Sequence, residues 1–278
     1  TALSVGAGGG RTTTLVGGLR NDGQISASAY EANATGAILN SGAVVDQLLN
    51  RGSIQSTASS YAASGVTASA RGLVLGAGSV ASTLNNYGTI SATRVGETGD
   101  AVAVLDQGGT LKTITNTGAI RATVAAPQFK ADGTVATVTA GGQTIALDLR
   151  ANNAGVTYTQ TGPSSFTSTT TFPSTDTVTS TDTTTVTSTP TTVGDVLFGG
   201  GNDTLNLNSG TLVGAMSFGA GQDRLSITNG AVALGKLTDS DGKLDISVAN
   251  GSLGILNSET INVSSLNIGS TGKILFSA

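Results

Sequence analysis

The stretch that decides the fold is Leu19-Arg20-Asn21-Asp22-Gly23-Gln24-Ile25, because the phrase Leu/Ile-x-Asn-x-Gly-x-Ile returns three more times along the chain. The other copies occupy residues 48–54, 84–90 and 114–120, and the four asparagines are 29, 36 and 30 residues apart. Repeats of this length are typical of solenoids, in which each coil covers the apolar face of the next.

Each repeat contains three short β-like runs separated by Gly or Asn. In the third repeat these runs cover residues 80–84, 90–93 and 101–105. The rival interpretation is a helix over the alanine-rich residues 57–70, but Ser and Gly interrupt that stretch and it lacks a helical stripe of large apolar residues. We therefore predict an all-β chain, a single right-handed parallel β-helix of about nine or ten coils.

The asparagines of the repeats are expected to mark corners of the coils. Asn tolerates the left-handed conformation and its amide can bond to the equivalent residue of the next coil, and Gly follows where φ can again be positive. The shorter C-terminal repeats place further asparagines 21 residues apart. The predicted structural ladder consists of Asn21, Asn50, Asn86, Asn116, Asn208, Asn229 and Asn250.

Composition divides the chain into three parts. Residues 1–156 form a β-helix with long coils of about 30 residues. Residues 157–192 are an insertion, a projecting hairpin or a loop, because 24 of these 36 residues are Thr or Ser and they cannot fill a core. Residues 193–278 continue the β-helix with shorter coils, since residues 198–207 are echoed 20 positions later at 218–227.

The amino-acid composition excludes several classes of function. A net charge of −4 and 4% aromatic residues argue against binding to nucleic acid or to anionic membranes. No apolar run approaches the ~20 residues of a membrane helix, so direct membrane insertion is not expected. The chain has no His and no Cys, which excludes thiol nucleophiles, Ser-His-Asp triads and ordinary zinc sites.

Two turns resemble half of a calcium-binding repeat. Gly-x-Gly-x-Asp-x-Leu occurs at residues 199–205 and 219–225, which makes Asp203 and Asp223 calcium candidates. The match is incomplete because such repeats follow one another at nine residues rather than 20. No other cofactor is expected. The remaining carboxylates, such as Asp46, Asp106 and Asp148, are scattered and give no paired spacing for glycan hydrolysis.

Residues 195–207, joined to the upstream Asn-x-Gly-x-Ile-x-Ala coils, resemble passenger domains of Gram-negative autotransporters. The resemblance covers most of the chain outside the Thr/Ser-rich insertion. It implies a right-handed parallel β-helix exported to the cell surface, with the protein's own outer-membrane translocator barrel as a partner in the full-length product. The serine-protease branch of that family requires a catalytic histidine, which this chain lacks.

These observations lead to an expectation of a non-catalytic structural or adhesive protein at the outer surface of a Gram-negative cell. Glycans, host surfaces or abiotic surfaces are the expected partners. The alternative is a self-assembling subunit of a filament or surface layer, because neither residues 1–18 nor residues 269–278 offer a capping helix and copies could stack end to end. A glycan-active enzyme is the third interpretation.

Overall fold

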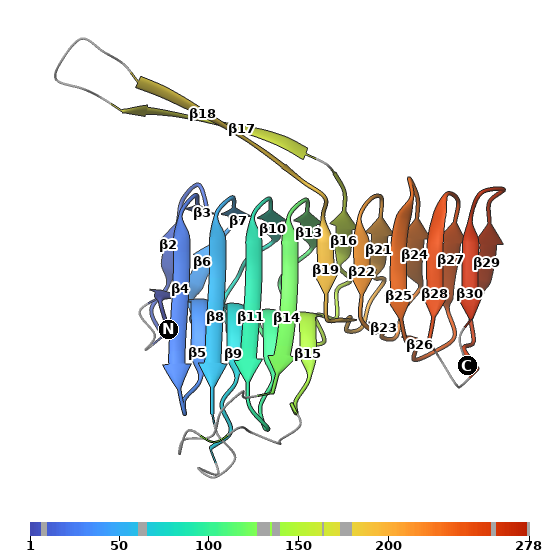
Figure 1. The fold of residues 1–278 in the computed structure, drawn as a ribbon, viewed down its shortest axis with the longest axis horizontal. Coiled ribbons are helices and arrows are strands. Elements are labelled where there is room, and N and C mark those ends of the chain that lie inside the picture. The colour runs from blue at the N-terminus through green and yellow to red at the C-terminus, as the bar shows by residue number, and fades with distance from the viewer. Residues whose placement is uncertain are drawn as a thin grey trace.

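The computed structural model describes residues 1–6, 10–60, 66–126, 134, 140–162, 164–172, 180–256 and 260–276; for residues 164–172 and 180–188 it describes the backbone. Every regular element in these ranges is a β-strand. Three parallel sheets run along the molecule (Figure 1), and we number them 1 to 3 in the order in which the chain enters them.

Each sheet is built from one strand of successive coils. Sheet 1 contains, in spatial order, β1 (Leu3–Val5), β5 (Ala34–Leu39), β9 (Ala70–Leu75), β12 (Ala101–Asp106), β15 (Thr144–Asp148), β20 (Asp195–Leu197), β23 (Met216–Phe218) and β26 (Leu237–Asp239). Sheet 2 contains β3 (Leu19–Asn21), β7 (Gln47–Asn50), β10 (Thr83–Asn86), β13 (Thr113–Asn116), β16 (Thr157–Gln160), β21 (Thr204–Leu207), β24 (Asp223–Ile227), β27 (Leu244–Val248) and β29 (Ser265–Ile268). Sheet 3 contains β4 (Gln24–Tyr30), β8 (Ser53–Ser59), β11 (Thr89–Val95), β14 (Ala119–Ala125), β19 (Thr191–Val193), β22 (Thr211–Val213), β25 (Ala231–Gly235), β28 (Gly251–Ile255) and β30 (Lys273–Phe276).

The predicted parallel β-helix is confirmed by this topology. Neighbouring strands in every long sheet come from adjacent coils and pair in parallel, so the chain passes through sheets 1, 2 and 3 once per turn. Sheets 2 and 3 have nine strands each, which corresponds to nine coils. A short parallel pair, β2 (Thr13–Leu15) with β6 (Ala43–Val45), adds a fourth side to the first two coils.

The repeated phrase sets the register between coils. Asn21, Asn50, Asn86 and Asn116 stand opposite one another at the ends of consecutive sheet 2 strands. Residues along most strands of sheets 2 and 3 alternate between the interior and the surface, as the period of two in the sequence requires. In β5, β9, β12 and β15 of sheet 1, most residues are buried. Equivalent residues of successive coils therefore form columns that run along the stack.

The interior is filled by two groups of side chains. The larger core consists mainly of stacked aliphatic residues and includes the consecutive sheet 2 column Leu48, Leu84 and Ile114. The smaller core contains only alanines among its buried residues: Ala34, Ala58, Ala68, Ala70, Ala92, Ala101 and Ala122. Because alanine is small, sheets 1 and 3 can approach closely where their longer strands overlap.

The stack has a wide and a narrow half (Figure 1). In sheet 3, strands β4, β8, β11 and β14 have seven residues each, whereas β19, β22, β25, β28 and β30 have three to five. This change follows from the shortening of the sequence repeat from about 30 to about 20 residues.

The Thr/Ser-rich segment is only partly an insertion. Residues 157–160 form β16 and residues 191–193 form β19, and both strands belong to the stack. The predicted boundaries of 157–192 were therefore too wide, because alternating Thr residues also suit the outer face of a stacked strand. Between these strands, β17 (Ser164–Phe172) and β18 (Ser180–Ser188) pair in an antiparallel hairpin that extends away from the stack (Figure 1).

Candidate functional surfaces

A ladder of asparagine side chains joins the first four repeats. Asn21 Nδ2 donates to Asn50 Oδ1 at 2.7 Å, Asn50 Nδ2 to Asn86 Oδ1 at 2.7 Å, and Asn86 Nδ2 to Asn116 Oδ1 at 2.8 Å. The three donating amides also bond backbone carbonyls, at Ser53, Thr89 and Ala119 respectively. Asn50, Asn86 and Asn116 are at most 1% exposed, so the ladder lies inside the corner and is part of the scaffold.

Beyond Asn116 other residue types occupy the ladder position. Asn116 Nδ2 lies 3.4 Å from Gln160 Oε1, and Thr192 Oγ1 donates to the same oxygen at 2.6 Å. The Tyr158 hydroxyl completes this buried cluster at 2.6 Å from Thr192 Oγ1, and burial raises the pKa of Tyr158 to about 12. The next residues in register are apolar, starting with Leu207, so the ladder ends at the fifth coil.

The three C-terminal asparagines do not continue the ladder, and that part of the prediction was wrong. Asn208, Asn229 and Asn250 follow the inward residues of their strands by one or two positions. Asn208 Oδ1 accepts a hydrogen bond from Thr228 Oγ1 at 3.0 Å, and Asn229 has a φ of 51°. No side-chain hydrogen bond links the three to one another within the described ranges.

The glycines of the repeated phrase serve close packing rather than an unusual backbone conformation. Gly23, Gly52, Gly88 and Gly118 do not have positive φ, contrary to the expectation from the sequence. A Cβ atom on Gly52, Gly88 or Gly118 would instead lie less than 3.0 Å from backbone atoms of the glycine one coil earlier. The corner carries glycine because successive coils touch there backbone to backbone.

The two calcium candidates are inward-facing residues of consecutive coils. Asp203 is 0% and Asp223 1% exposed. Asp203 Oδ1 accepts the backbone N–H of Val156, and Asp223 Oδ1 accepts the backbone N–H of Asp203, both at 2.7 Å. The Oδ2 atom of each aspartate is buried and has no hydrogen-bond partner. We call this pair the carboxyl column.

Burial governs the ionisation of the carboxyl column. Desolvation raises the pKa of Asp203 to about 7, and the neighbouring Asp223 carboxylate adds to the rise. Desolvation also raises the pKa of Asp223, with further contributions from Asp239 and Asp241. In the part of the chain that the structure describes, no three acidic side chains converge to form a metal-binding group. Each carboxyl group of the column bonds to a backbone N–H of the preceding coil.

The other carboxylates named from the sequence lie in different environments. Asp46 is exposed. Asp106 is buried and accepts backbone N–H bonds from Gly109 and Leu111, while burial raises its pKa. Asp148 forms an ion pair with Arg150 at 2.7 Å. These groups do not form a pair on a common outer face.

A flat patch of hydroxyl and amide side chains covers the outer face of sheet 2. Four consecutive strands, β10, β13, β16 and β21, place their outward residues in two columns in register. We call this patch the threonine face; its members are Thr83, Thr113, Thr157 and Thr204 in one column and Asn85, Thr115, Thr159 and Asn206 in the other.

The threonine face has no charged residue, and each of its four strands pairs with a neighbour on both sides. The residues between its columns, Leu84, Ile114, Tyr158 and Leu205, point inward and are at most 1% exposed. Among its described side chains one mutual hydrogen bond occurs, from Asn206 Nδ2 to Thr159 Oγ1 at 3.5 Å. Most of its hydroxyl groups are therefore free to bond with water or with a ligand.

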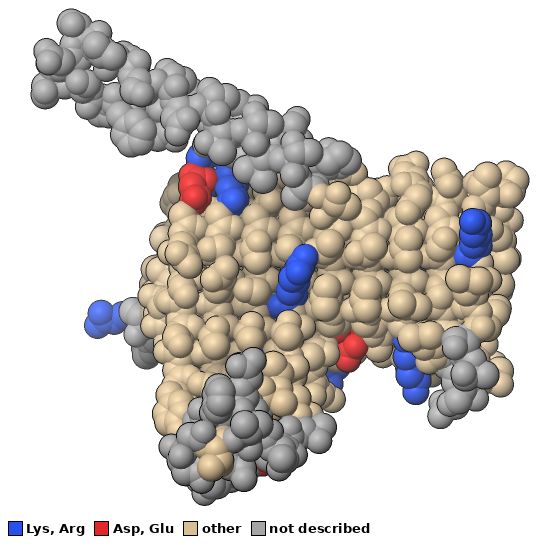
Figure 2. All heavy atoms as spheres, in the orientation of Figure 1, with Lys and Arg blue, Asp and Glu red and all other residues tan. Residues whose placement is uncertain are grey.

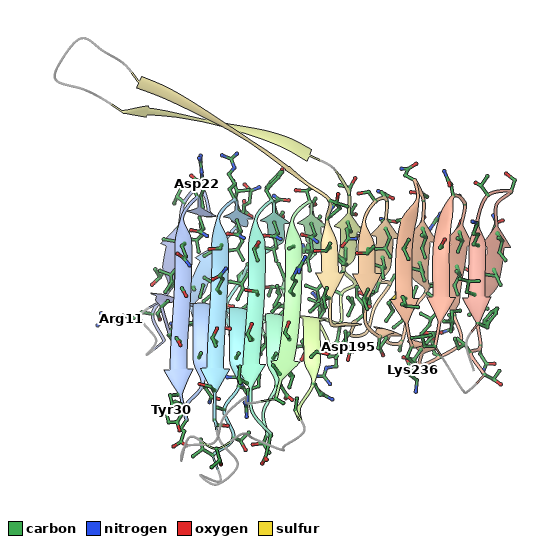
Figure 3. The ribbon with its side chains drawn as sticks, viewed as in Figure 1. Arg11, Asp22, Tyr30, Asp195 and Lys236 are labelled. Atoms are coloured by element: carbon green, nitrogen blue, oxygen red, sulfur yellow. The ribbon has the colours of Figure 1, made fainter. Side chains whose placement is uncertain are left out.

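The outer face of sheet 3 has a different character. Figure 2 shows this face with few and isolated charged side chains, and Arg121 on β14 and Lys273 on β30 belong to it. Between these two strands the exposed apolar residues Val213, Val232 and Leu234 lie beside hydroxyl residues such as Thr211. Several charged residues lie at the corners: Asp22 at the upper corner, and Asp195 and Lys236 at the lower one (Figure 3).

One buried charge was missed in the sequence. Arg94 on β11 is 0% exposed and donates to the carbonyl of Thr98 and to Ser60 Oγ, whereas its Nη1 has no hydrogen-bond partner. Burial lowers the pKa of Arg94. The alternation Ile90-x-Ala92-x-Arg94 already placed this side chain inward, which was the available signal.

No family model, no curated protein and no solved structure matches this chain. The described residues also include no helix that is long and apolar enough to cross a membrane.

Proposed function

We propose that this protein is a non-catalytic structural or adhesive β-helix at the outer surface of a Gram-negative cell. The observation that carries the proposal is the threonine face, a preformed and uncharged array on a rigid sheet. Equivalent hydroxyls in successive coils lie ~4.8 Å apart, so the array repeats along the stack. A flat surface of this kind suits an extended or repeating ligand better than a small molecule, which needs a concave pocket.

Neutral glycans are the partner that this chemistry favours. Threonine hydroxyls donate and accept hydrogen bonds, as sugar hydroxyls do. Threonine is also stiff at χ1, which reduces the entropy lost when a ligand binds. Single contacts of this type are weak, so useful affinity requires many contacts along a polymer. The cell-surface location rests on the resemblance of the repeats to autotransporter passengers.

Removing two hydroxyls from the threonine face tests this proposal. We expect Thr113→Val with Thr157→Val to weaken binding to immobilised neutral linear polysaccharides about tenfold, because two hydrogen bonds of ~0.5–1.5 kcal/mol are lost while side-chain shape is kept. The measurement is biosensor binding of the whole chain. Thr57→Val with Thr93→Val on sheet 3 is the matched control, since these residues are also aligned in adjacent coils. Equal losses in both variants, or no binding by the unaltered chain, would contradict the proposal.

Self-assembly is the second candidate function, and the hairpin favours it. Strands β17 and β18 pair over nine residues without a bulge, and no third strand joins them in the described ranges. Natural edge strands are usually protected by charges, prolines or bulges, and β17 has no charged residue or proline. An isolated two-stranded hairpin is also only marginally stable in water. A second copy could supply the missing strands by pairing β17 with β17.

Under the hairpin route we expect Thr169→Lys with Thr171→Lys to abolish a concentration-dependent dimer in sedimentation velocity. The same substitutions at Thr57 and Thr93 should leave it intact. A monomeric unaltered chain at high concentration would exclude this second function.

A further inference from the structure

The carboxyl column joins the fifth, sixth and seventh coils of the stack. Asp203 precedes β21 in the sixth coil, and its Oδ1 accepts the N–H of Val156 in the fifth coil, whose sheet 3 strand β19 is already short. Asp223 repeats the same bond one coil later, to the N–H of Asp203. Two consecutive coil-to-coil contacts therefore depend on buried carboxyl groups.

These carboxyl groups have little to stabilise a negative charge. Each has a single hydrogen-bond donor, and both Oδ2 atoms are buried without a partner. A buried charge without a counter-ion is far more costly than a buried neutral acid. The free energy of the ionised column is therefore high, and protonation relieves it.

Among the residues that the structure describes, the charged groups around the column do not supply a counter-ion. Asp239 and Asp241, from β26 and the turn after it, raise the pKa of Asp223 further. Lys243 is engaged with Asp241, with Nζ at 3.0 Å from Oδ2. Arg224 lies on the exposed outer face of β24. On the side of the fifth coil the column meets the neutral N–H of Val156.

We infer that the carboxyl column is a proton-dependent latch that holds the sixth and seventh coils onto the fifth when it is protonated and weakens these contacts when it ionises. The inference is independent of the proposed adhesive function. It assigns to Asp203 and Asp223 a role in the pH response of the fold in place of a metal site.

The direction of the pH effect follows from the position of the Asp203 pKa. The pKa of Asp203 is about 7 in the folded chain, against an ordinary value of 3.8. The stability that this residue contributes is therefore complete below about pH 4 and is lost as the pH rises through about 7. A difference of about three pKa units corresponds to roughly a thousandfold change in the folding equilibrium constant.

The test compares thermal and denaturant unfolding of three full-length chains between pH 4 and 9. Asp203→Asn keeps an oxygen for the Val156 N–H but cannot ionise, so we expect it to exceed the unaltered chain in stability above pH 7 and to flatten the profile. Asp195→Asn is the matched control, because Asp195 Oδ1 accepts the N–H of Ala215 at 2.7 Å at a less buried position. This variant should retain the pH dependence.

Two further measurements make the inference independent of whether Asp203→Asn folds well. The ¹³C resonance of the Asp203 carboxyl in the unaltered chain should titrate near pH 7. A titration in the ordinary range, or parallel pH profiles for the unaltered chain and Asp203→Asn, would overturn the latch. Calcium chloride at pH 8, with a chelator control, should leave the stability unchanged. Stabilisation by calcium that requires Asp203 would show that a metal, and not a proton, neutralises the column.

Discussion

Gly88→Ala is expected to destabilise the fold by about 3 kcal/mol or more, whereas Gly23→Ala at the equivalent corner should be neutral or slightly stabilising. The Cβ of an alanine at position 88 would lie less than 3.0 Å from the carbonyl oxygen of Gly52. The obstructing atoms belong to the backbone of the neighbouring coil, so a side-chain rotation cannot relieve the clash. The parallel ladders on either side of the corner would have to shift.

Gly23 provides the matched control for this prediction. It occupies the same place in the repeated phrase, but no atom lies within 4 Å of a Cβ built there, and its φ is not positive. Alanine at such a site reduces the entropy of the unfolded chain and commonly stabilises by about 0.4–1 kcal/mol. Urea unfolding followed by circular dichroism measures both variants. Equal effects at the two glycines would mean that backbone conformation, and not coil-to-coil contact, explains why glycine recurs at this position of the repeated phrase.

The fold was predictable because the repeated phrase encodes the coil directly. The Asn-x-Gly corner needs an amide that bonds along the stack and a glycine that lets the next coil approach, so both residues return in each of the first four coils. The alternation of residues after each corner then assigns the inward side chains. Spacing and alternation together were sufficient to predict parallel strands in register.

The regular spacing of asparagines gave a wrong prediction in the C-terminal coils, where the asparagines occupy a different position within the corner. Asn208, Asn229 and Asn250 recur as regularly as the true ladder, yet Leu207, Ile227 and Val248 occupy the inward position in those coils. A period in the sequence does not reveal on which side of the corner a side chain lies. Conversely, Gln160 was missed because it has the same role as an asparagine but a different residue type.

The environment of the acidic turns was not predictable from the local motif. The glycine-rich motif made Asp203 a calcium candidate. The alternation Asp203-x-Leu205-x-Leu207, however, places the aspartate on the same inward face as two core leucines. Burial and the missing partner of its Oδ2 atom emerge only when the coils are stacked. Such tertiary effects are outside the reach of a local pattern.

Asn86→Ala is expected to lower the free energy of unfolding by about 3–5 kcal/mol, because it interrupts the ladder in its fully buried middle. The substitution leaves Asn50 Nδ2 without its acceptor and removes the donor to Asn116 Oδ1 and to the carbonyl of Ala119. Each buried polar group left unsatisfied costs about 1–3 kcal/mol. Water cannot easily replace these bonds, since Asn50, Asn86 and Asn116 are at most 1% exposed.

Asn21→Ala at the half-buried start of the ladder is the control. It should lower the free energy of unfolding by about 1 kcal/mol, because solvent can reach the polar groups that lose their partner. Equilibrium unfolding in urea gives both values. If the ladder acts as a chain of coupled bonds, the double variant Asn50→Ala with Asn86→Ala should cost less than the sum of the two single substitutions, since the bond between them is lost only once. Additive costs would mean that each asparagine stabilises its own corner independently, and the ladder would then be a repeated local motif without coupling between coils.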